Sequence, residues 1–452
     1  MHRAVQTLPR AARHICRAHL YAHRRTFLNP ALQYLRKTVL KSALSSNLSL
    51  VSELKQRLGQ KYLLNENLHE SVFLSKPLLE VSDEVALQRL TEEVFQDLEA
   101  FADGADPFAL AQEDIKVVSF EMLDLAKSVY PEVSEVSRYL LQIPGKRVRP
   151  LLCVLVNRAM ERAYPDQFRE GDNGARLLQF RLAELAEMIH TASLMHDDVI
   201  DAADKRRGVE AAHRVFDNKK AILGGDFLLA RACRMVAGLG SLETCQRISN
   251  AVESLARGEL VQFQGLTGGG SVNQMLEVYL QKTFYKTAAL MAESVCCGAI
   301  LGGYEETNQK WAFEVGSNFG MAFQLYDDLL DMTSSAEKLG KPAMSDLAAG
   351  VATAPLIFSA AGSQTGSSGR ETEREVAGLV SRKLRGEGDL QKAAQLIEGG
   401  LGLQRTRAAV GLHCRRTLDL LKEVPPGHDG RPNVFVRGLA ALLLHTVTRT
   451  KG

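Results

Sequence analysis

The sequence predicts an all-α protein, a single large helical bundle with a central substrate cavity. Apolar residues recur every three or four positions through long segments, as on one face of an amphipathic helix. Alternating β-branched runs, which would indicate strands, are short. Glycine and proline clusters separate the helical segments. These segments are expected at residues 113–142, 176–201, 222–264, 274–302 and 311–333, and helical patterning resumes from about 371 and again at 434–448.

Three regions are expected along the 452 residues. Residues 1–52 contain nine Lys/Arg and no Asp or Glu, a composition typical of a targeting presequence. A mitochondrial presequence is the first interpretation, a plastid transit peptide the second, and a disordered basic tail the third. Residues 53–105 are polar and mixed, and we expect an N-terminal connector with helices. Residues 106–452 are expected to form one all-α catalytic domain.

Composition excludes several functional classes. The net charge is +2, but without residues 1–52 there are 46 basic and 53 acidic residues, so the body is mildly acidic and no nucleic-acid partner is expected. The seven cysteines show no C-x-x-C spacing, which argues against structural zinc. No uninterrupted apolar stretch reaches membrane-spanning length, so we expect at most peripheral membrane contact, through a hydrophobic product.

Two acidic clusters have the same spacing and each follows an apolar run. The first ends the segment 176–201, and the second lies 130 residues further on. In each cluster the outer aspartates are four residues apart and share one helix face. Such carboxylates repel one another unless a cation lies between them, and Mg²⁺ binds one or two carboxylates together with substrate phosphates. The clusters are Asp197, Asp198 and Asp201, and Asp327, Asp328 and Asp331.

Four basic motifs are interleaved with these clusters. Lysine and arginine near helix ends are often merely solvated or offset the helix dipole. Together with two acidic clusters, however, cationic pockets are what two diphosphate-bearing substrates require. The motifs are Gly145-Lys146-Arg147-Val148-Arg149-Pro150, Lys205-Arg206-Arg207-Gly208, Tyr285-Lys286-Thr287-Ala288 and Gly340-Lys341-Pro342.

In order and spacing, these motifs resemble the trans-polyprenyl diphosphate synthases over roughly residues 105–450. The sequence around Phe323-Gln324-Leu325 and after Gly340 is most similar to that of the long-chain solanesyl and decaprenyl synthases of ubiquinone side-chain biosynthesis. Pro144 stands where this family often has glycine, and His213 where asparagine is usual. The resemblance implies the isoprenoid synthase fold and a Mg²⁺-dependent prenyltransferase in mitochondria, in the matrix or at the inner membrane.

The resemblance also implies roles for single residues. All six aspartates would hold two or three Mg²⁺ ions on the diphosphate of the allylic substrate, which would be farnesyl or geranylgeranyl diphosphate. Asp197, Asp198, Asp201, Lys286, Asp327 and Asp328 would be catalytic. The allylic diphosphate would contact Arg206, Lys286, Thr287, Gln324 and Lys341. Isopentenyl diphosphate would bind Lys146, Arg149, His190 and Arg207.

Product length is expected to depend on the helix that precedes the first cluster. Small or unbranched side chains one and two turns before Asp197 would leave a tunnel open, whereas a phenylalanine would close it. A packing role for the small residues is the alternative interpretation. These residues are Ala192, Ser193, Met188 and Ile189.

The alternatives for function are a shorter-chain, geranylgeranyl-type synthase, a terpene cyclase, and a catalytically weak subunit of a heteromeric synthase. Cyclases usually replace the second acidic cluster, and partner subunits tend to lose the acidic motifs, but both clusters are whole here. We expect a homodimer or a heteromer with a related subunit.

Overall fold

The computed structural model describes residues 70–168, 173–264, 270–333, 344–361 and 367–449. All of them belong to one compact unit, Leu68–Gly452. The expected presequence 1–52 lies outside the described residues. The N-terminal half contains η1 (Glu70–Phe73), η2 (Lys76–Glu80), α5 (Glu84–Ala102), α6 (Pro107–Leu110), α7 (Gln112–Leu125), α8 (Pro131–Gln142), α9 (Val148–Ala163) and α10 (Asn173–Ile200), then strands β1 (Lys205–Arg206) and β2 (Val209–Glu210), then α11 (Ala212–Phe216) and α12 (Asn218–Gly238).

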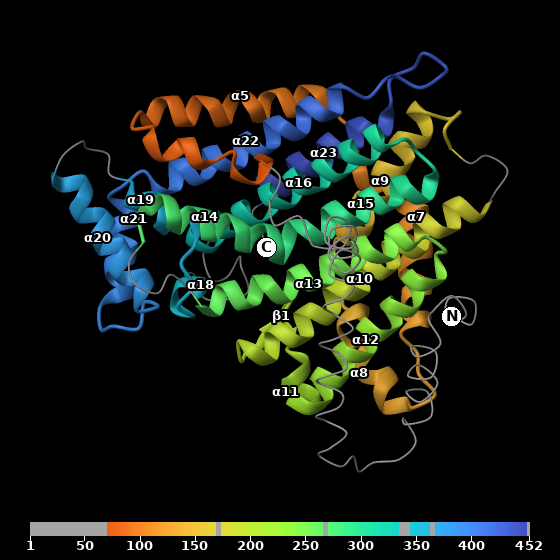
Figure 1. Ribbon diagram of the computed structural model, residues 1–452, viewed down its shortest axis with the longest axis horizontal. Helices are drawn as coiled ribbons and strands as arrows, with labels where there is room; N and C mark the ends of the chain where they lie inside the picture. The colour runs from red at the N-terminus through yellow and green to blue at the C-terminus, as the bar shows by residue number, and fades with distance from the viewer. Residues whose placement is uncertain (1–69, 169–172, 265–269, 334–343, 362–366, 450–452) are drawn as a thin grey trace, which may run out of the picture. The chain divides into compact units, whose positions relative to one another are not determined.

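The remaining elements are also helices, so the described part of the chain is all-α apart from the two-residue strands (Figure 1). They are α13 (Leu242–Gln264), α14 (Val272–Thr283), η3 (Phe284–Ala288), α15 (Ala289–Gly302), α16 (Glu306–Thr333), α18 (Ser345–Ala348), α19 (Ala354–Ala360), α20 (Ser367–Ser381), α21 (Asp389–Glu398), α22 (Gly402–Lys422) and α23 (Val434–Thr448). The predicted all-α architecture is confirmed.

Three helices form the centre of the bundle. Helix α15 packs against both α10 and α16, so it lies between the two helices that end in the acidic clusters (Figure 1). Twelve of the fourteen residues of α15 are buried, including Ala292, Val295 and Ala299. Because α15 is apolar all round, it is a core helix, and the charged ends of α10 and α16 are placed beside it.

The helical run Val272–Gly302 joins α14, η3 and α15. By length and composition it could cross a membrane, with a mean hydropathy of 1.3 in its most apolar window, although the sequence suggested no such stretch. Inside the bundle 78% of that window is buried. Burial in the protein core accounts for its apolar composition.

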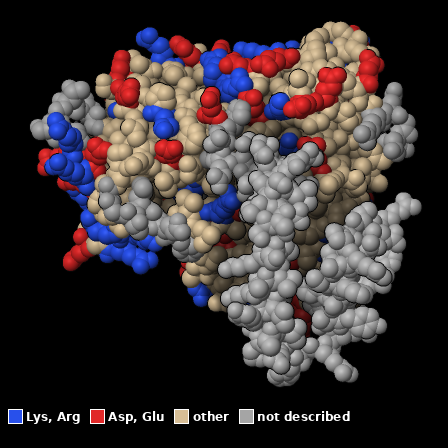
Figure 2. Space-filling view, viewed as in Figure 1, with Lys and Arg blue, Asp and Glu red and all other residues tan. Residues whose placement is uncertain are grey.

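Helix α5, from the expected connector, packs on α22 and α23 near the other end of the chain. Its apolar side chains Leu87, Val94 and Leu98 are buried in the same core cluster as residues of α22 and α23. On the face shown in Figure 2, basic and acidic side chains are interspersed along the edge where Figure 1 shows α5 and α22. One such pair, Arg415 with Asp97, is 2.5 Å apart.

Candidate active site

The first acidic cluster lies where α10 ends. The helix stops because Ala202 adopts a left-handed conformation, with φ +51°. Asp198 is fully buried, and its Oδ1 accepts a hydrogen bond from Arg206 Nε at 2.9 Å. Its Oδ2 is buried without a hydrogen-bond partner. Asp197 is half-buried and Asp201 exposed, so these two carboxylates are available to a ligand.

The electrostatic surroundings of Asp197 are unfavourable to its charge. Burial raises the pKa of Asp197 to about 6; Lys286 opposes this rise, and the carboxylates of Glu259 and Asp201 add to it. Burial also raises the pKa of Asp201. A cation between these groups would relieve the repulsion.

The second acidic cluster lies at the end of α16, and two of its carboxylates, Asp328 and Asp331, are buried. Asp328 Oδ2 accepts a hydrogen bond from Tyr279 Oη at 2.6 Å and from the Ala354 amide at 3.3 Å. Its Oδ1 accepts from Gln324 Nε2 at 3.1 Å. Burial raises the pKa of Asp328 to about 6, against the opposing charge of Lys282. The protein itself therefore binds both oxygens of Asp328.

The other two carboxylates of this cluster differ in exposure. Asp331 is 2% exposed and accepts hydrogen bonds from Ser345 Oγ at 2.8 Å and from the Asp346 amide at 3.2 Å. Asp327 is 34% exposed at its side chain and forms an ion pair with Arg449, just beyond α23. The Arg449 guanidinium also lies 4.4 Å from the centre of the Phe323 ring. Asp327 is thus the carboxylate of this cluster that is open to solvent.

A π-helical turn, η3, lies between the two clusters and carries Lys286 and Thr287. The Lys286 ammonium group contacts the Glu259 carboxylate and donates to Gln262 Oε1 at 3.3 Å. Thr287 Oγ1 donates to Gln324 Oε1 at 2.8 Å. Since Glu259 affects the pKa of Asp197 and Gln324 binds Asp328, this turn links the two clusters; π-helical turns are frequent at functional sites.

The β1–β2 hairpin separates two adjacent arginines. Its two-residue loop, Arg207-Gly208, has φ values of +51° and +82°, as a type I′ turn requires. Arg206 points to Asp198 of the first cluster. Arg207 lies against another loop, because a Cβ added at Gly145 would come within 3.1 Å of Arg207 Nη1.

The second basic site is an arginine pocket around His190. Burial lowers the pKa of His190 well below its usual value, and Arg149 and Arg207 lower it further. Burial also lowers the pKa of Arg149 to about 10. The charge of Arg147 is offset within the protein, since its Nη1 binds the buried carboxylate of Glu187 at 2.9 Å. An excess of cations over carboxylates suits this pocket to a polyanion.

A family comparison matches residues 130–397, more than half of the chain, to the polyprenyl synthetase model. The chain belongs to the polyprenyl synthetase family. It is 32% identical to solanesyl-diphosphate synthase 1, mitochondrial, of Oryza sativa subsp. japonica, covering 76% of this chain and 79% of the rice protein. It is 34% identical to a probable hexaprenyl pyrophosphate synthase, mitochondrial, of Neurospora crassa, covering 74% and 81%.

A solved structure also matches this polyprenyl synthetase. It is the polyprenyl synthase of Caulobacter crescentus complexed with calcium and isoprenyl diphosphate, with 29% identity and a TM-score of 0.64 over 76% of this chain and 97% of the other. The predicted family, isoprenoid synthase fold and enzyme class, a prenyltransferase, are confirmed by these matches.

The predicted site residues of this synthetase fall into two groups in the structure. Those assigned to the allylic diphosphate lie around η3 and the ends of α10 and α16, except Lys341, which is outside the described residues. Of those assigned to isopentenyl diphosphate, Arg149, His190 and Arg207 belong to the arginine pocket. Lys146 precedes α9, and burial and the nearby charge of Arg449 lower its pKa. Arg449 also pairs with Asp327 of the second acidic cluster.

Sequence reasoning missed five residues at or beside the candidate site. Glu187 and Glu259 stand inside helical runs whose spacing suggests only amphipathic helices, and Tyr279 and Arg449 reach Asp328 and Asp327 from distant segments. Arg147 is part of the basic motif, but nothing in the motif tells that it binds Glu187.

The residues expected to set product length line the buried sides of α10. Met188 and Ala192 pack in a cluster with side chains of α7, α8 and α12. Ile189 belongs to a second cluster with side chains of α12, α13 and α15. Ser193 is partly buried, and its Oγ donates to the carbonyl of His190 at 2.9 Å. Three of the four side chains therefore face the spaces between neighbouring helices.

Prenyl diphosphate synthases are in general Mg²⁺-dependent, and the residues fit that ion. Within the described residues, no group of three or more His, Cys, Asp or Glu is gathered closely enough to hold a metal alone. The donors at the site are carboxylate oxygens, the ligands that Mg²⁺ prefers, and Mg²⁺ is usually bound by one or two of them with substrate phosphates. Asp197 and Asp201 would supply two carboxylates from the first cluster, and Asp327 would supply one from the second.

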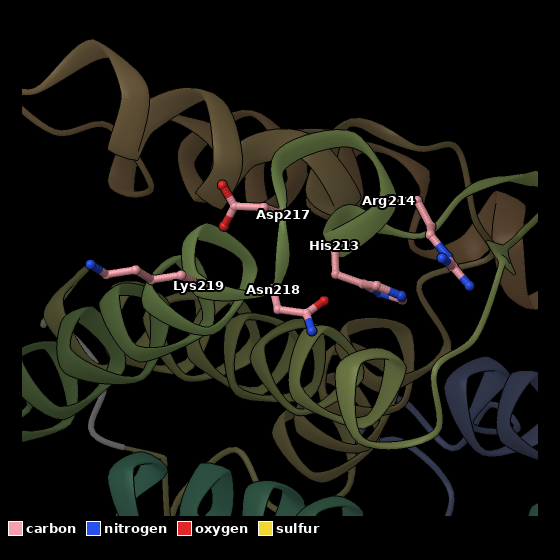
Figure 3. A pocket seen from close by; sticks show the side chains of 5 residues that line it. All are labelled: His213, Arg214, Asp217, Asn218 and Lys219. Carbon is pink, nitrogen blue, oxygen red and sulfur yellow. The ribbon is translucent and has the colours of Figure 1, made fainter.

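A surface hollow of about 590 Å³ lies at the corner of α11 and α12 (Figure 3). Its lining includes His213, where the family usually has asparagine; the His213 side chain is buried and its Nδ1 has no hydrogen-bond partner. Arg214 pairs with Asp204 at 2.7 Å. None of the predicted site residues line this hollow.

Proposed function

We propose that the protein is a long-chain trans-polyprenyl diphosphate synthase that adds isopentenyl diphosphate repeatedly to an allylic diphosphate. The observation that carries this proposal is that charged side chains gather in two separate places, each suited to an anion. One consists of carboxylates around Lys286, suited to a diphosphate that arrives with metal ions, and the other is the arginine pocket around His190. Joining two diphosphate substrates requires two such sites.

At the first site, Asp197, Asp201 and Asp327 would hold two or three Mg²⁺ ions with the allylic diphosphate. The ions supply positive charge against the charge that develops on the departing diphosphate. Asp198, Asp328 and Asp331 complete the two clusters, but they are buried and accept hydrogen bonds from Arg206, Tyr279 and Ser345. The allylic primer would be farnesyl or geranylgeranyl diphosphate.

Cationic and polar side chains would add to the binding and stabilisation that the metal ions supply. Arg206, Lys286, Thr287, Gln324 and Lys341 bind the allylic diphosphate and stabilise its departure, which leaves an allylic cation. Lys146, Arg149, His190 and Arg207 hold isopentenyl diphosphate so that its double bond reaches that cation.

The surroundings of the site also determine the protonation state of His190 and the access of water to the allylic cation. With its lowered pKa, His190 is neutral at neutral pH and donates a hydrogen bond rather than a charge. The released diphosphate takes the proton lost after bond formation. The surrounding apolar helices exclude water, which would otherwise capture the cation.

The product is a long all-trans polyprenyl diphosphate, the precursor of the ubiquinone tail. The long-chain names of the rice and Neurospora relatives support this length, as does the small side chain of Ala192 one turn before Asp197. Their mitochondrial names, with the basic, acid-free residues 1–52, support a mitochondrial location, and the name of a chloroplastic and mitochondrial relative keeps the plastid as the alternative. We propose a homodimer or a heteromer with a related subunit; membrane contact would come only through the product.

One assay tests this function. Purified protein is incubated with Mg²⁺, farnesyl or geranylgeranyl diphosphate and labelled isopentenyl diphosphate, and the dephosphorylated products are sized. Products much longer than geranylgeranyl support the proposal, and excess chelator should abolish their formation. Products no longer than geranylgeranyl would favour the shorter-chain alternative. No incorporation until a partner subunit is added would favour the weak-subunit alternative.

A further inference from the structure

Helix α13 brings two groups to the ammonium of Lys286. The Glu259 carboxylate pairs with it, and Gln262 Oε1 accepts a hydrogen bond from it at 3.3 Å. Gln262 Nε2 also donates to Glu259 Oε1 at 3.5 Å. Residues three apart are neighbours on one helix face, so Glu259 and Gln262 form a two-residue cradle for one lysine.

The backbone of α13 is unusually close to the turn that carries this lysine. A Cβ at Gly258 would lie 2.5 Å from Lys286 Cγ, 3.1 Å from its backbone nitrogen and 3.2 Å from Tyr285 Cβ. Because backbone atoms cannot give way as a flexible side chain does, position 258 requires glycine. The backbone beside Glu259 is therefore held close to the backbone and Cγ of Lys286.

The Glu259 side chain is only 14% exposed, and that of its partner Lys286 is 23% exposed. A carboxylate this far removed from water is unfavourable unless it interacts with a cation, and Lys286 is the cation it contacts. The arrangement therefore carries an electrostatic cost, which a function for Glu259 would explain.

We infer that Glu259 is a positioning residue that holds the Lys286 ammonium group toward the first acidic cluster, where the allylic diphosphate binds. This inference rests on the proposed role of Lys286. Lysine has a flexible four-carbon stem, and ordering it costs entropy each time a substrate binds. Anchored by Glu259 and Gln262, the ammonium group exchanges a carboxylate oxygen for a phosphate oxygen with little movement of its stem.

The direct test is Glu259→Gln, which keeps the shape of the side chain and removes its charge. Because a charge-assisted hydrogen bond contributes about 1.5–3 kcal/mol, kcat/KM for the allylic diphosphate should fall about 10- to 100-fold. KM for isopentenyl diphosphate and the melting temperature should stay near the wild-type values. Glu253→Gln, on an exposed turn of α13 where Glu253 pairs with Arg257 at 2.9 Å, is the matched control and should leave activity unchanged.

A double-mutant cycle with Lys286→Gln separates positioning from a general structural role. If Glu259 acts through Lys286, Glu259→Gln should change kcat/KM less than twofold in the Lys286→Gln background. Where turnover of that background is too slow, calorimetric binding of an unreactive allylic thiodiphosphate with Mg²⁺ replaces kcat/KM. An equal loss in both backgrounds, or no loss in the wild-type background, would overturn the inference.

Two further comparisons separate a loss of positioning from a loss of folding and from failure of the proposed function. If Glu259→Gln lowers the melting temperature, Glu259→Asp, which retains the charge, should recover most of the allylic kcat/KM; equal impairment of both variants would contradict positioning. A wild-type enzyme that incorporates no isopentenyl diphosphate would count against the proposed function. An active wild type with an unaffected Glu259→Gln variant would refute only the role of Glu259.

Discussion

At the scale of single residues, the aspartates of each cluster differ in their surroundings. In the first cluster, Asp198 is fully buried and bound to Arg206, whereas Asp197 and Asp201 are more accessible. The repeated acidic spacing in the sequence treats these positions as equivalent. The inner residue is held by Arg206 of the β1–β2 hairpin, whereas the outer pair stays accessible.

This difference predicts different effects of two substitutions. Asp197→Asn should lower kcat by roughly 10²–10³ with little change in stability, because it removes a ligand-facing charge. Asp198→Asn should in addition destabilise the fold by about 3 kcal/mol, because Arg206 loses the charge of its buried partner. Labelled-substrate kinetics and urea unfolding measure the two effects. Unchanged unfolding midpoints in both variants would contradict the assignment.

At the scale of helices, the separation of α15 and α16 sets the distance between Lys286 and the second cluster. A Cβ at Gly320 would lie 2.5 Å from Ala288 Cα, and one at Gly316 would lie 2.7 Å from Ala292 Cα. Gly316 and Gly320, one helical turn apart, thus allow the backbone of α16 to approach the backbones of η3 and α15 closely. This contact brings Gln324 within hydrogen-bond distance of Thr287.

Gly320→Ala should therefore push α16 away from η3. Overpacking of this kind costs about 1–3 kcal/mol, and kcat should fall because Gln324 loses Thr287. Thermal unfolding and kcat are the measurements. Gly378→Ala in α20 is the control: its new Cβ would meet only the end of the flexible Arg382 side chain at 3.1 Å, so stability should stay level or rise. Equal behaviour of the two variants would contradict the packing argument.

The packing of α10 predicts an effect on product length. Ala192 is fully buried beside side chains of α8 and α12, one turn before Asp197. Ala192→Phe would fill the space through which the growing chain passes, so the longest product should lose several isoprene units. Product sizing measures this, with Ala192→Ser as a control of nearly equal volume. Unchanged product length in the phenylalanine variant would favour a packing role alone.

At the scale of the whole molecule, distant parts of the chain fold as one unit. Helix α5 packs on α22 and α23, and Arg437 of α23 pairs with Asp103 at 2.6 Å, 334 residues away in sequence. Because these helices share one core, the free energy of unfolding is a property of the whole unit, and buried ionisable groups contribute to it.

Glu184 predicts how global stability changes with pH. Its side chain, in α10, is fully buried, and burial raises its pKa to about 8, although Arg181 opposes the rise. The folded protein therefore keeps a proton that the unfolded chain has lost, and stability falls as pH rises from about 4.5 to about 8. Melting temperatures of the wild type and Glu184→Gln across this range should diverge, with the wild type losing more. Parallel curves would contradict the shift.

The sequence was sufficient to predict the helices and the positions of the two clusters, because helical periodicity and motif spacing are local properties. Contacts across the fold were not predictable. Tyr279 reaches Asp328 from another helix, and Glu187 binds Arg147 across 40 residues. Local propensity also could not reveal that Asp331 accepts a hydrogen bond from Ser345, 14 residues further along the chain.

The division of labour among the carboxylates has a thermodynamic consequence. If neither Asp197 with Asp201 nor Asp327 completes a coordination shell, phosphate oxygens must supply the remaining ligands. Metal and allylic diphosphate then strengthen each other's binding by the same factor, as linkage requires. The concentration of free Mg²⁺ in the compartment would thereby set the apparent affinity for the primer, and primer would set the affinity for the ion.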